Sequence, residues 1–260
     1  MSGYILCQTK RAKTPYFIEN ISTNIYTMEE LCYYLYHNLY LVDRSIINEN
    51  LCVWLSEELG LVQLAAKLRP HLGKFAAIED VLYPIFKEIN YLTYEELREL
   101  NTRLARLDAE LPIVREKKKG DALVENGMLV RGMQLYEGIL KKKGLVQEQT
   151  ALAAAICHNL GCVCSYLFQM EKATDYFWRA YQLDEEKDSL VTYLLAYRII
   201  HTQAECRERL LGLSVEEDVM EAVGKALEEF KKKPAVPVDA GNIDARLEEF
   251  MREYHRSTGS

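Results

Sequence analysis

One helical motif occurs twice in the central part of the chain, and it constrains the fold more than any other feature. The clearer copy places Cys157, Leu160, Gly161 and Cys164 ahead of Ala173, Phe177 and Ala180. A shift of 41 residues, from 161 back to 120, sets Gly120, Gly132, Tyr136 and Ile139 under Gly161, Ala173, Phe177 and Ala180. Small residues let two antiparallel helices approach closely, and large residues fill the seam between them. Residues 113–183 are therefore predicted to form stacked helical hairpins.

This spacing resembles the tetratricopeptide repeat. The usual repeat has about 34 residues, so the first copy needs a longer connection, and Lys141 to Gly144 supply it. The resemblance implies an all-α solenoid in which the first helix of each pair lines a concave surface. It also implies a scaffold that binds a peptide or protein segment and does not catalyse a reaction.

Polar residues line the concave surface that the resemblance implies. Counting from the two glycines gives the candidate peptide-binding residues Lys117, Asp121, His158, Asn159 and Cys162, with Tyr193 added if the third helix keeps the register. An extended peptide cannot satisfy its own backbone groups, so such side chains can pair with them. Asn159 is the best placed because its amide both donates and accepts.

The first copy also resembles the tetratricopeptide domains that clamp the C-terminal carboxylate of chaperones. Lys117 and Asn159 match that pattern. Asp121 stands where the family has asparagine, and Ser189 and Tyr193 stand where it has a basic pair. Because an aspartate repels a carboxylate, we expect a general peptide groove in place of a carboxylate clamp.

His158 and Cys162 share one helix face, which raises the question of a metal or a Cys–His nucleophile. A structural zinc site needs four ligands, and no third ligand lies nearby in sequence. The seven cysteines are odd in number and show no disulfide-framework spacing, which is typical of reduced thiols in a cytoplasmic protein. We expect no metal, no cofactor and apolar packing for Cys157 and Cys164.

Residues 1–26 form a first predicted domain. Two β-prone runs, at 4–7 and 16–18, flank a basic loop and predict a small N-terminal β-hairpin.

A helical region, 27–111, follows. It begins at the capping box of Thr27 and Glu30. Tyr33, Tyr36 and Tyr40 then line one helix face. That face is either a wide edge of the core or an aromatic patch for a partner.

Further helices are predicted at 48–59 and 61–69, and at 75–90 with a kink at Pro84. A second capping box at Thr93 begins a long helix. Its leucines step by three and four residues and predict a buried seam at Leu97, Leu100, Leu104, Leu107 and Leu111.

The repeats occupy 112–232 in this interpretation. They continue into one helix over 188–210 and another that Ser214 caps and that ends near 232. A proline-containing linker and an amphipathic helix at 243–255 complete the chain as the predicted domain 233–260. We expect that helix to be a C-terminal capping helix, either on its own groove or on another copy. A homo-oligomer through this helix, or through the face of Tyr33, Tyr36 and Tyr40, is a second option.

Composition and charge narrow the classes of partner that this chain is expected to bind. A formal net charge of −7 argues against nucleic acid, which needs a basic surface. The sequence contains no apolar run of about 18 residues, so no membrane span is expected. The first residues place apolar side chains before basic ones, which is the reverse of a secretory signal. The lysine runs at 117–119, 141–143 and 231–233 are interpreted as solvated helix ends.

The sequence thus predicts a cytoplasmic adaptor that binds a peptide or protein. Two alternatives stay open: a peptide-sensing regulator, and an enzyme whose site is assembled from residues distant in sequence.

Overall fold

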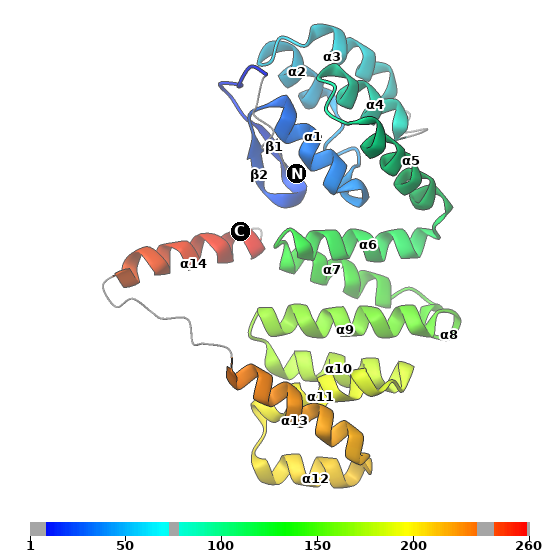
Figure 1. The fold of residues 1–260 in the computed structure, drawn as a ribbon, viewed down its shortest axis with the longest axis vertical. Coiled ribbons are helices and arrows are strands. Elements are labelled where there is room, and N and C mark those ends of the chain that lie inside the picture. The colour runs from blue at the N-terminus through cyan, green and yellow to red at the C-terminus, as the bar shows by residue number, and fades with distance from the viewer. Residues whose placement is uncertain (1–8, 73–77, 233–241, 259–260) are drawn as a thin grey trace. The chain divides into compact units, whose positions relative to one another are not determined.

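The computed structural model describes residues 9–72, 78–232 and 242–258, which are predominantly helical, with a small antiparallel sheet near the N-terminus (Figure 1). This confirms the predicted helical class with an N-terminal strand pair. The chain divides into two compact units, residues 1–128 and 129–260. The division falls inside the first copy of the repeated motif. The four predicted domains, and the three boundaries between them, remain predictions.

The first unit contains the sheet and the helices up to α6. Its elements are β1 (Tyr16–Ile18), η1 (Glu19–Ile21), β2 (Thr23–Ile25), α1 (Met28–His37), η2 (Leu39–Leu41), α2 (Glu49–Glu57), α3 (Val62–Leu68), η3 (Arg69–His71), α4 (Glu79–Glu88), α5 (Tyr94–Ala109) and α6 (Pro112–Glu125). Both predicted capping boxes, at Thr27 and Thr93, are confirmed. Helix α4 continues through Pro84.

The strand pair differs from the predicted hairpin. Strand β1 forms where expected, but it pairs antiparallel with β2, in the register Tyr16 to Ile25. The run at 4–7 lies outside the described residues. The turn explains the difference, because η1 and the left-handed Ser22 (φ 48°) reverse the chain directly after β1. The sheet is fixed to the first unit by the Tyr16 hydroxyl, which donates to the Ile46 carbonyl at 2.7 Å.

The leucine seam of α5 is buried only at its centre. Leu100 and Leu104 are buried, whereas Leu97 is 38% and Leu111 58% exposed. The predicted continuous seam is therefore wrong at its ends. The side-chain contacts of α5 with α4 and α1 are concentrated near its middle, where Tyr83 donates to Asn101 at 2.6 Å and Arg103 covers the ring of Tyr36 at 5.0 Å.

The second unit is a succession of helices that lie in layers, with α7, α9, α10 and α11 packed in chain order (Figure 1). Its elements are α7 (Leu129–Leu140), α8 (Leu145–Glu148), α9 (Thr150–Tyr166), α10 (Met170–Asp184), α11 (Lys187–Ile200), α12 (Gln203–Leu213), α13 (Glu217–Lys232) and α14 (Ile243–Thr258).

The close approach predicted at Gly161 is confirmed. A Cβ atom built on Gly161 would lie 2.5 Å from Cε1 of Phe177, closer than atoms can approach without displacement. Gly161 therefore lets α9 and α10 meet. Cys157 and Cys164 are buried, as expected for apolar packing positions on α9.

The helix predicted over 188–210 is wrong as a single element. It breaks after Ile200, and α12 begins at a third capping box, in which the Thr202 hydroxyl accepts from the Glu205 amide at 3.3 Å and the Glu205 carboxylate accepts from the Thr202 amide at 2.8 Å. The box satisfies free amides at a new helix start, so the break is encoded locally.

Ser214 does not cap α13 as predicted. It adopts a left-handed conformation (φ 49°) and closes α12, while α13 begins at Glu217. An N-cap residue requires extended backbone, which excludes Ser214 from that role.

Helix α14 forms where the amphipathic pattern predicts it. Its backbone approaches α7, yet its large apolar side chains are exposed by 47–60%. Its capping role stays a prediction. The proposed linker at 233–241 lies outside the described residues.

Candidate functional site

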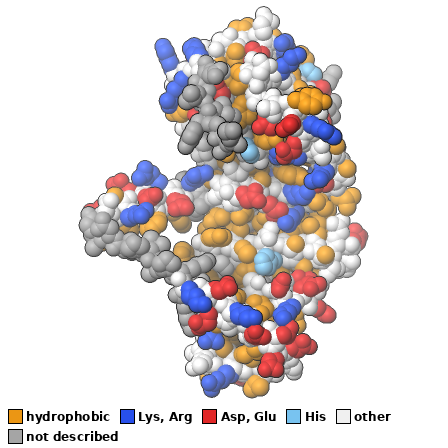
Figure 2. Space-filling view, viewed as in Figure 1, with side chains coloured by type: hydrophobic (Ala, Val, Ile, Leu, Met, Phe, Trp, Pro, Cys, Tyr) orange, Lys and Arg blue, Asp and Glu red, His pale blue; other side chains and the backbone are white. Residues whose placement is uncertain are grey.

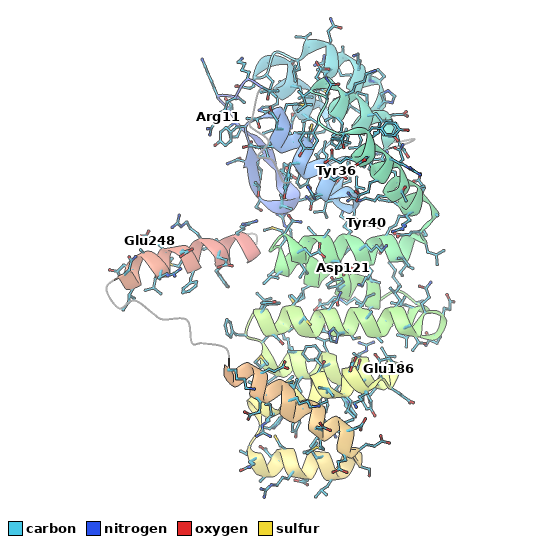
Figure 3. The ribbon with its side chains drawn as sticks, in the orientation of Figure 1. Arg11, Tyr36, Tyr40, Asp121, Glu186 and Glu248 are labelled. Carbon is cyan, nitrogen blue, oxygen red and sulfur yellow. The ribbon has the colours of Figure 1, made fainter. Side chains whose placement is uncertain are left out.

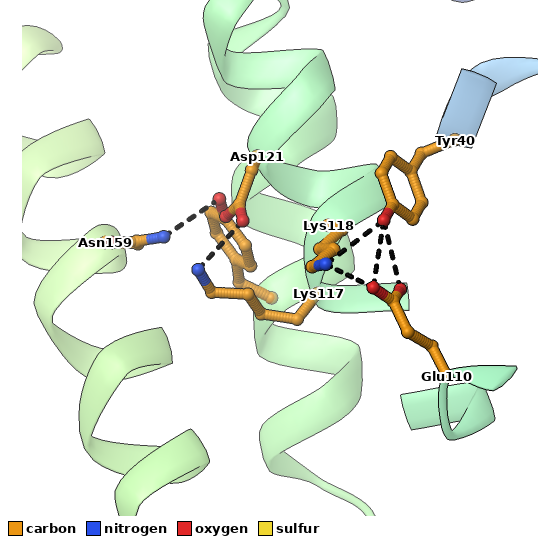
Figure 4. Close-up of polar contacts among 7 residues, drawn as sticks. Tyr40, Glu110, Lys117, Lys118, Asp121 and Asn159 are labelled. Atoms are coloured by element: carbon orange, nitrogen blue, oxygen red, sulfur yellow. Dashed lines mark hydrogen bonds and ion pairs between the residues drawn. The ribbon is translucent and has the colours of Figure 1, made fainter. Parts of the chain in front are cut away.

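The six predicted binding residues divide between the two units. Lys117 and Asp121 lie one turn apart on α6, in the first unit, and form an ion pair at 2.8 Å (Figure 4). The charge of Lys117 is thus already balanced by its neighbour on the same helix. A ligand carboxylate would have to compete with Asp121 for it.

The whole lysine run of α6 is paired. The ammonium of Lys118 pairs with the Glu110 carboxylate and donates to the Tyr40 hydroxyl at 3.1 Å (Figure 4). Lys119 pairs with Asp43 at 2.7 Å. The predicted solvated helix end is wrong for this run, because these lysines lie within α6 and are paired. Lys117 pairs with a carboxylate of α6 itself, and Lys118 and Lys119 pair with carboxylates of the loops beside it.

The pKa values agree with this pairing. Burial acts to raise the pKa of Glu110, but hydrogen bonds from Lys118 and Tyr40 outweigh it and lower that pKa below its usual range. The hydrogen bond to Glu110 raises the pKa of Lys118. The cluster therefore remains charged and holds α6 to the first unit.

The predicted aromatic face on α1 and η2 is also largely occupied by internal contacts. Tyr40 belongs to the lysine cluster, and Tyr36 contacts His37, Phe86 and Arg103. Figure 3 marks Tyr36 and Tyr40 in the first unit. Tyr33 alone of the three predicted tyrosines is mostly exposed. This arrangement favours the edge-of-core interpretation.

His158, Asn159 and Cys162 lie on α9 in the second unit. The His158 ring packs edge-on against Phe177 at 5.5 Å, and the Asn159 amide donates to the Tyr136 hydroxyl at 3.3 Å. Cys162 is half-buried against the core, and burial raises the pKa of its thiol. In the part of the chain that the structure describes, no three His, Cys, Asp or Glu side chains are placed to hold a metal ion.

Tyr193 is the predicted residue that leads to a cavity. Its side chain is 3% exposed and lines a surface cavity of about 530 Å³ in the second unit. The other lining residues are Glu171, Thr174, Asp175, Trp178, Tyr197, Ile200, His201 and Arg209. They come from α10, α11, the turn after α11, and α12. His158, Asn159 and Cys162 do not line this cavity.

An aromatic wall forms one side of the cavity. Tyr193, Tyr197 and His201 follow each other at intervals of four residues, which places them on one side of α11 and its end. Tyr197 stacks on His201 with ring centroids 3.8 Å apart. Trp178 of α10 extends the wall, with its ring 4.8 Å from that of Tyr193.

Arg209 of α12 is held against this wall. Its guanidinium carbon lies 4.4 Å from the Trp178 ring centre and 5.4 Å from that of Tyr193. Its Nε donates to the Tyr193 hydroxyl at 2.7 Å. Burial raises the pKa of Tyr193 although Arg209 acts to lower it. These contacts fix the guanidinium while its terminal nitrogens make no ion pair with any described carboxylate.

The charges of the cavity differ from those of α6. Among the described residues, Glu171, Asp175 and Arg209 form no ion pair. The cavity therefore offers flat aromatic surface together with charges of both signs.

The sequence interpretation missed Trp178, Tyr197 and Arg209. The four-residue spacing of Tyr193, Tyr197 and His201 could have indicated the wall. Arg209 could not be placed while 188–210 was taken as one straight helix.

Comparison with protein-family models, with curated proteins and with solved structures gives no significant match for the chain. No helix in the described ranges combines the length and apolar character needed to cross a bilayer.

Proposed function

We propose that this chain is a binding scaffold that holds a peptide or protein segment at the cavity between α10, α11 and α12. The proposal includes a tetratricopeptide-like arrangement of the second unit. The support for that arrangement is the packing of α9, α10 and α11 in chain order and the contact of Gly161 with Phe177.

The observation that carries the proposal is that the Arg209 guanidinium is held in place by Trp178 and Tyr193 but forms no ion pair with a described carboxylate. A guanidinium fixed by two aromatic rings and one hydrogen bond has already lost much of its conformational freedom, so less entropy is lost when a ligand binds. Its terminal N–H groups form a planar fork suited to a carboxylate. Partial burial strengthens such a contact relative to water.

The opposite charges select the ligand further. Glu171 and Asp175 can pair with a lysine or arginine of a ligand, and the exposed part of the aromatic wall can stack against an apolar or planar side chain. A peptide segment with side chains of both signs around an apolar one matches these three features. The volume of about 530 Å³ lies in the range of common ligand sites.

The predicted binding residues on α9 have a smaller role in this proposal. His158 and Asn159 are half-buried and already contact Phe177 and Tyr136. They remain proposed as outer contacts of the same ligand. Lys117 and Asp121 are not included in this proposal because they pair with each other.

Panning of the purified chain against a random peptide library tests the proposal. Enriched peptides should carry at least one acidic residue, and Arg209→Ala should lower their affinity by about tenfold or more. Arg209→Lys should recover only part of it, since an ammonium lacks the planar fork.

Arg207 provides the matched control. It is an exposed arginine on the same helix and does not line the cavity, so Arg207→Ala should bind enriched peptides like wild type. If no peptide is enriched, or if Arg209→Ala binds them as tightly as wild type, this cavity is not the binding site.

A further inference from the structure

Helix α14 carries an apolar stripe of largely exposed side chains. The exposed large apolar residues of the helix are Ile243, Leu247, Phe250, Met251 and Tyr254. Each is exposed by 47–60%. Isolated apolar side chains on a surface are ordinary, but five on one side of a single helix mark an interaction surface.

The spacing of the stripe is that of a helix pair. Ile243, Leu247, Phe250 and Tyr254 step by four, three and four residues, which are the d, a, d and a positions of a heptad pattern. Side chains with this spacing pack best against another helix that has the same spacing. Met251 lies beside the stripe at an e position.

We propose that α14 is a self-association helix that pairs antiparallel with α14 of a second copy of this chain. In the antiparallel arrangement each a residue meets a d residue of the other copy. Leu247 then meets Phe250, and Ile243 meets Tyr254. The two-fold symmetry repeats both contacts, so four apolar layers fill the seam without a gap.

The charges beside the stripe fit this orientation. With those layers aligned, the g position Arg246 faces the g position Glu253 of the second copy, and symmetry makes this pair twice. At the e positions Asp244 faces Met251, so no like charges meet. A parallel pair in register would place Arg246 opposite Met251 and form no ion pair between the copies among the described residues.

The polar face argues against an anionic membrane surface as the occupant. A helix that binds such a surface is rich in lysine and arginine. Acidic and basic side chains both lie over α14 (Figure 2). The acidic ones include Glu248 and Glu249, and the basic ones include Arg252.

The seam is short, and this sets its strength. The four layers lie within one 16-residue helix, so the interface is confined to a single short helix pair. Small interfaces are typical of weak, transient association. The association should therefore be reversible and concentration-dependent. It is independent of the cavity on α10 to α12 and goes beyond the proposed peptide binding.

Sedimentation equilibrium of the full chain, over about 5 to 500 µM, tests the inference. Wild type should shift from monomer to dimer within that range. Phe250→Glu buries a charge in the seam and should abolish the shift. Arg246→Glu and Glu253→Arg each place like charges together and should weaken association by about tenfold. The combined swap should restore it, because the two charges again oppose each other.

Arg252→Glu is the control. It makes the same change in charge as Arg246→Glu but lies at an f position, away from the seam, so it should leave the association close to that of wild type. Circular dichroism of each variant checks that helix content is kept, since Arg246 also pairs with Glu249 at 2.9 Å. The inference fails if wild type stays monomeric throughout, if Phe250→Glu leaves association unchanged, or if the combined swap does not restore it.

Discussion

The two sides of α10 show two ways for helices to meet. On one side Phe177 fills the space that Gly161 leaves open, so α9 and α10 touch without a gap. On the other side Trp178, the next residue, lines a cavity of about 530 Å³. The glycine lets α9 and α10 pack closely, and we call this contact the closed seam. The large rings and the break between α11 and α12 leave a cavity beside α10, and we call this the open seam. Closed seams stabilise the fold, and open ones provide surface for binding.

The largest effect is expected at the closed seam. Gly161→Leu should lower the free energy of unfolding by about 2 kcal/mol or more through overpacking, because Phe177 already occupies the position of the added side chain. Denaturant unfolding measures the change.

Gly138 on α7 is the matched control, because a Cβ atom there meets nothing within 4 Å. Gly138→Leu should be neutral or stabilise by up to about 1 kcal/mol through helix propensity, because Gly138 is exposed. Equal effects at both glycines would contradict the assignment of a closed seam.

At the open seam, Trp178→Ala should cost about 1–2 kcal/mol, since it removes the ring contacts with Tyr193 and Arg209. It should also weaken peptide binding, because Arg209 loses its support. Thermal unfolding and a binding titration report the two losses separately. Tyr166→Ala is the control, because it removes an exposed ring of α9 and should change stability by less than about 0.5 kcal/mol. If both variants lose a similar amount of stability, the ring contacts of Trp178 do not stabilise the fold.

The turn between α11 and α12 should have a smaller effect. Thr202→Ala removes the capping hydroxyl that accepts from the Glu205 amide and should cost about 1 kcal/mol. Thr202→Ser keeps the cap and should behave like wild type. Hydrogen exchange across α12 locates the loss, and uniform protection in the alanine variant would show that the box does not hold this helix.

The last effect is confined to alkaline pH. Burial, followed by the nearby Glu137, raises the pKa of Tyr176 from its ordinary 10.0 to about 12. The unfolded chain ionises this phenol first, so its contribution to stability is complete below pH 10 and is lost as the pH rises toward 12. Tyr176→Phe should flatten this part of the stability curve. An unchanged alkaline slope in that variant would assign the loss to other groups.

Local signals were sufficient for most of the helices. The boxes at Thr27 and Thr93 mark helix starts because the side chain and amide that pair are three residues apart. The third box, at Thr202, had the same form, and its omission led to the wrong long helix. The partner of β1 was missed for another reason, since it depended on the left-handed conformation of Ser22, which the sequence does not specify.

Placement of the site depended on contacts between distant residues. The sequence by itself determined that Gly161 needs a close neighbour, that α14 has an apolar side, and that Tyr193 belongs to a helix of this unit. Only the tertiary structure decided that Arg209 rests on Trp178 and that Lys118 finds Glu110 and Tyr40. The physical reason is that helix spacing fixes which residues share a face, whereas the neighbour of that face is set by turns and packing. Whether a charge pairs within the fold or stays open to a ligand is determined by that neighbour.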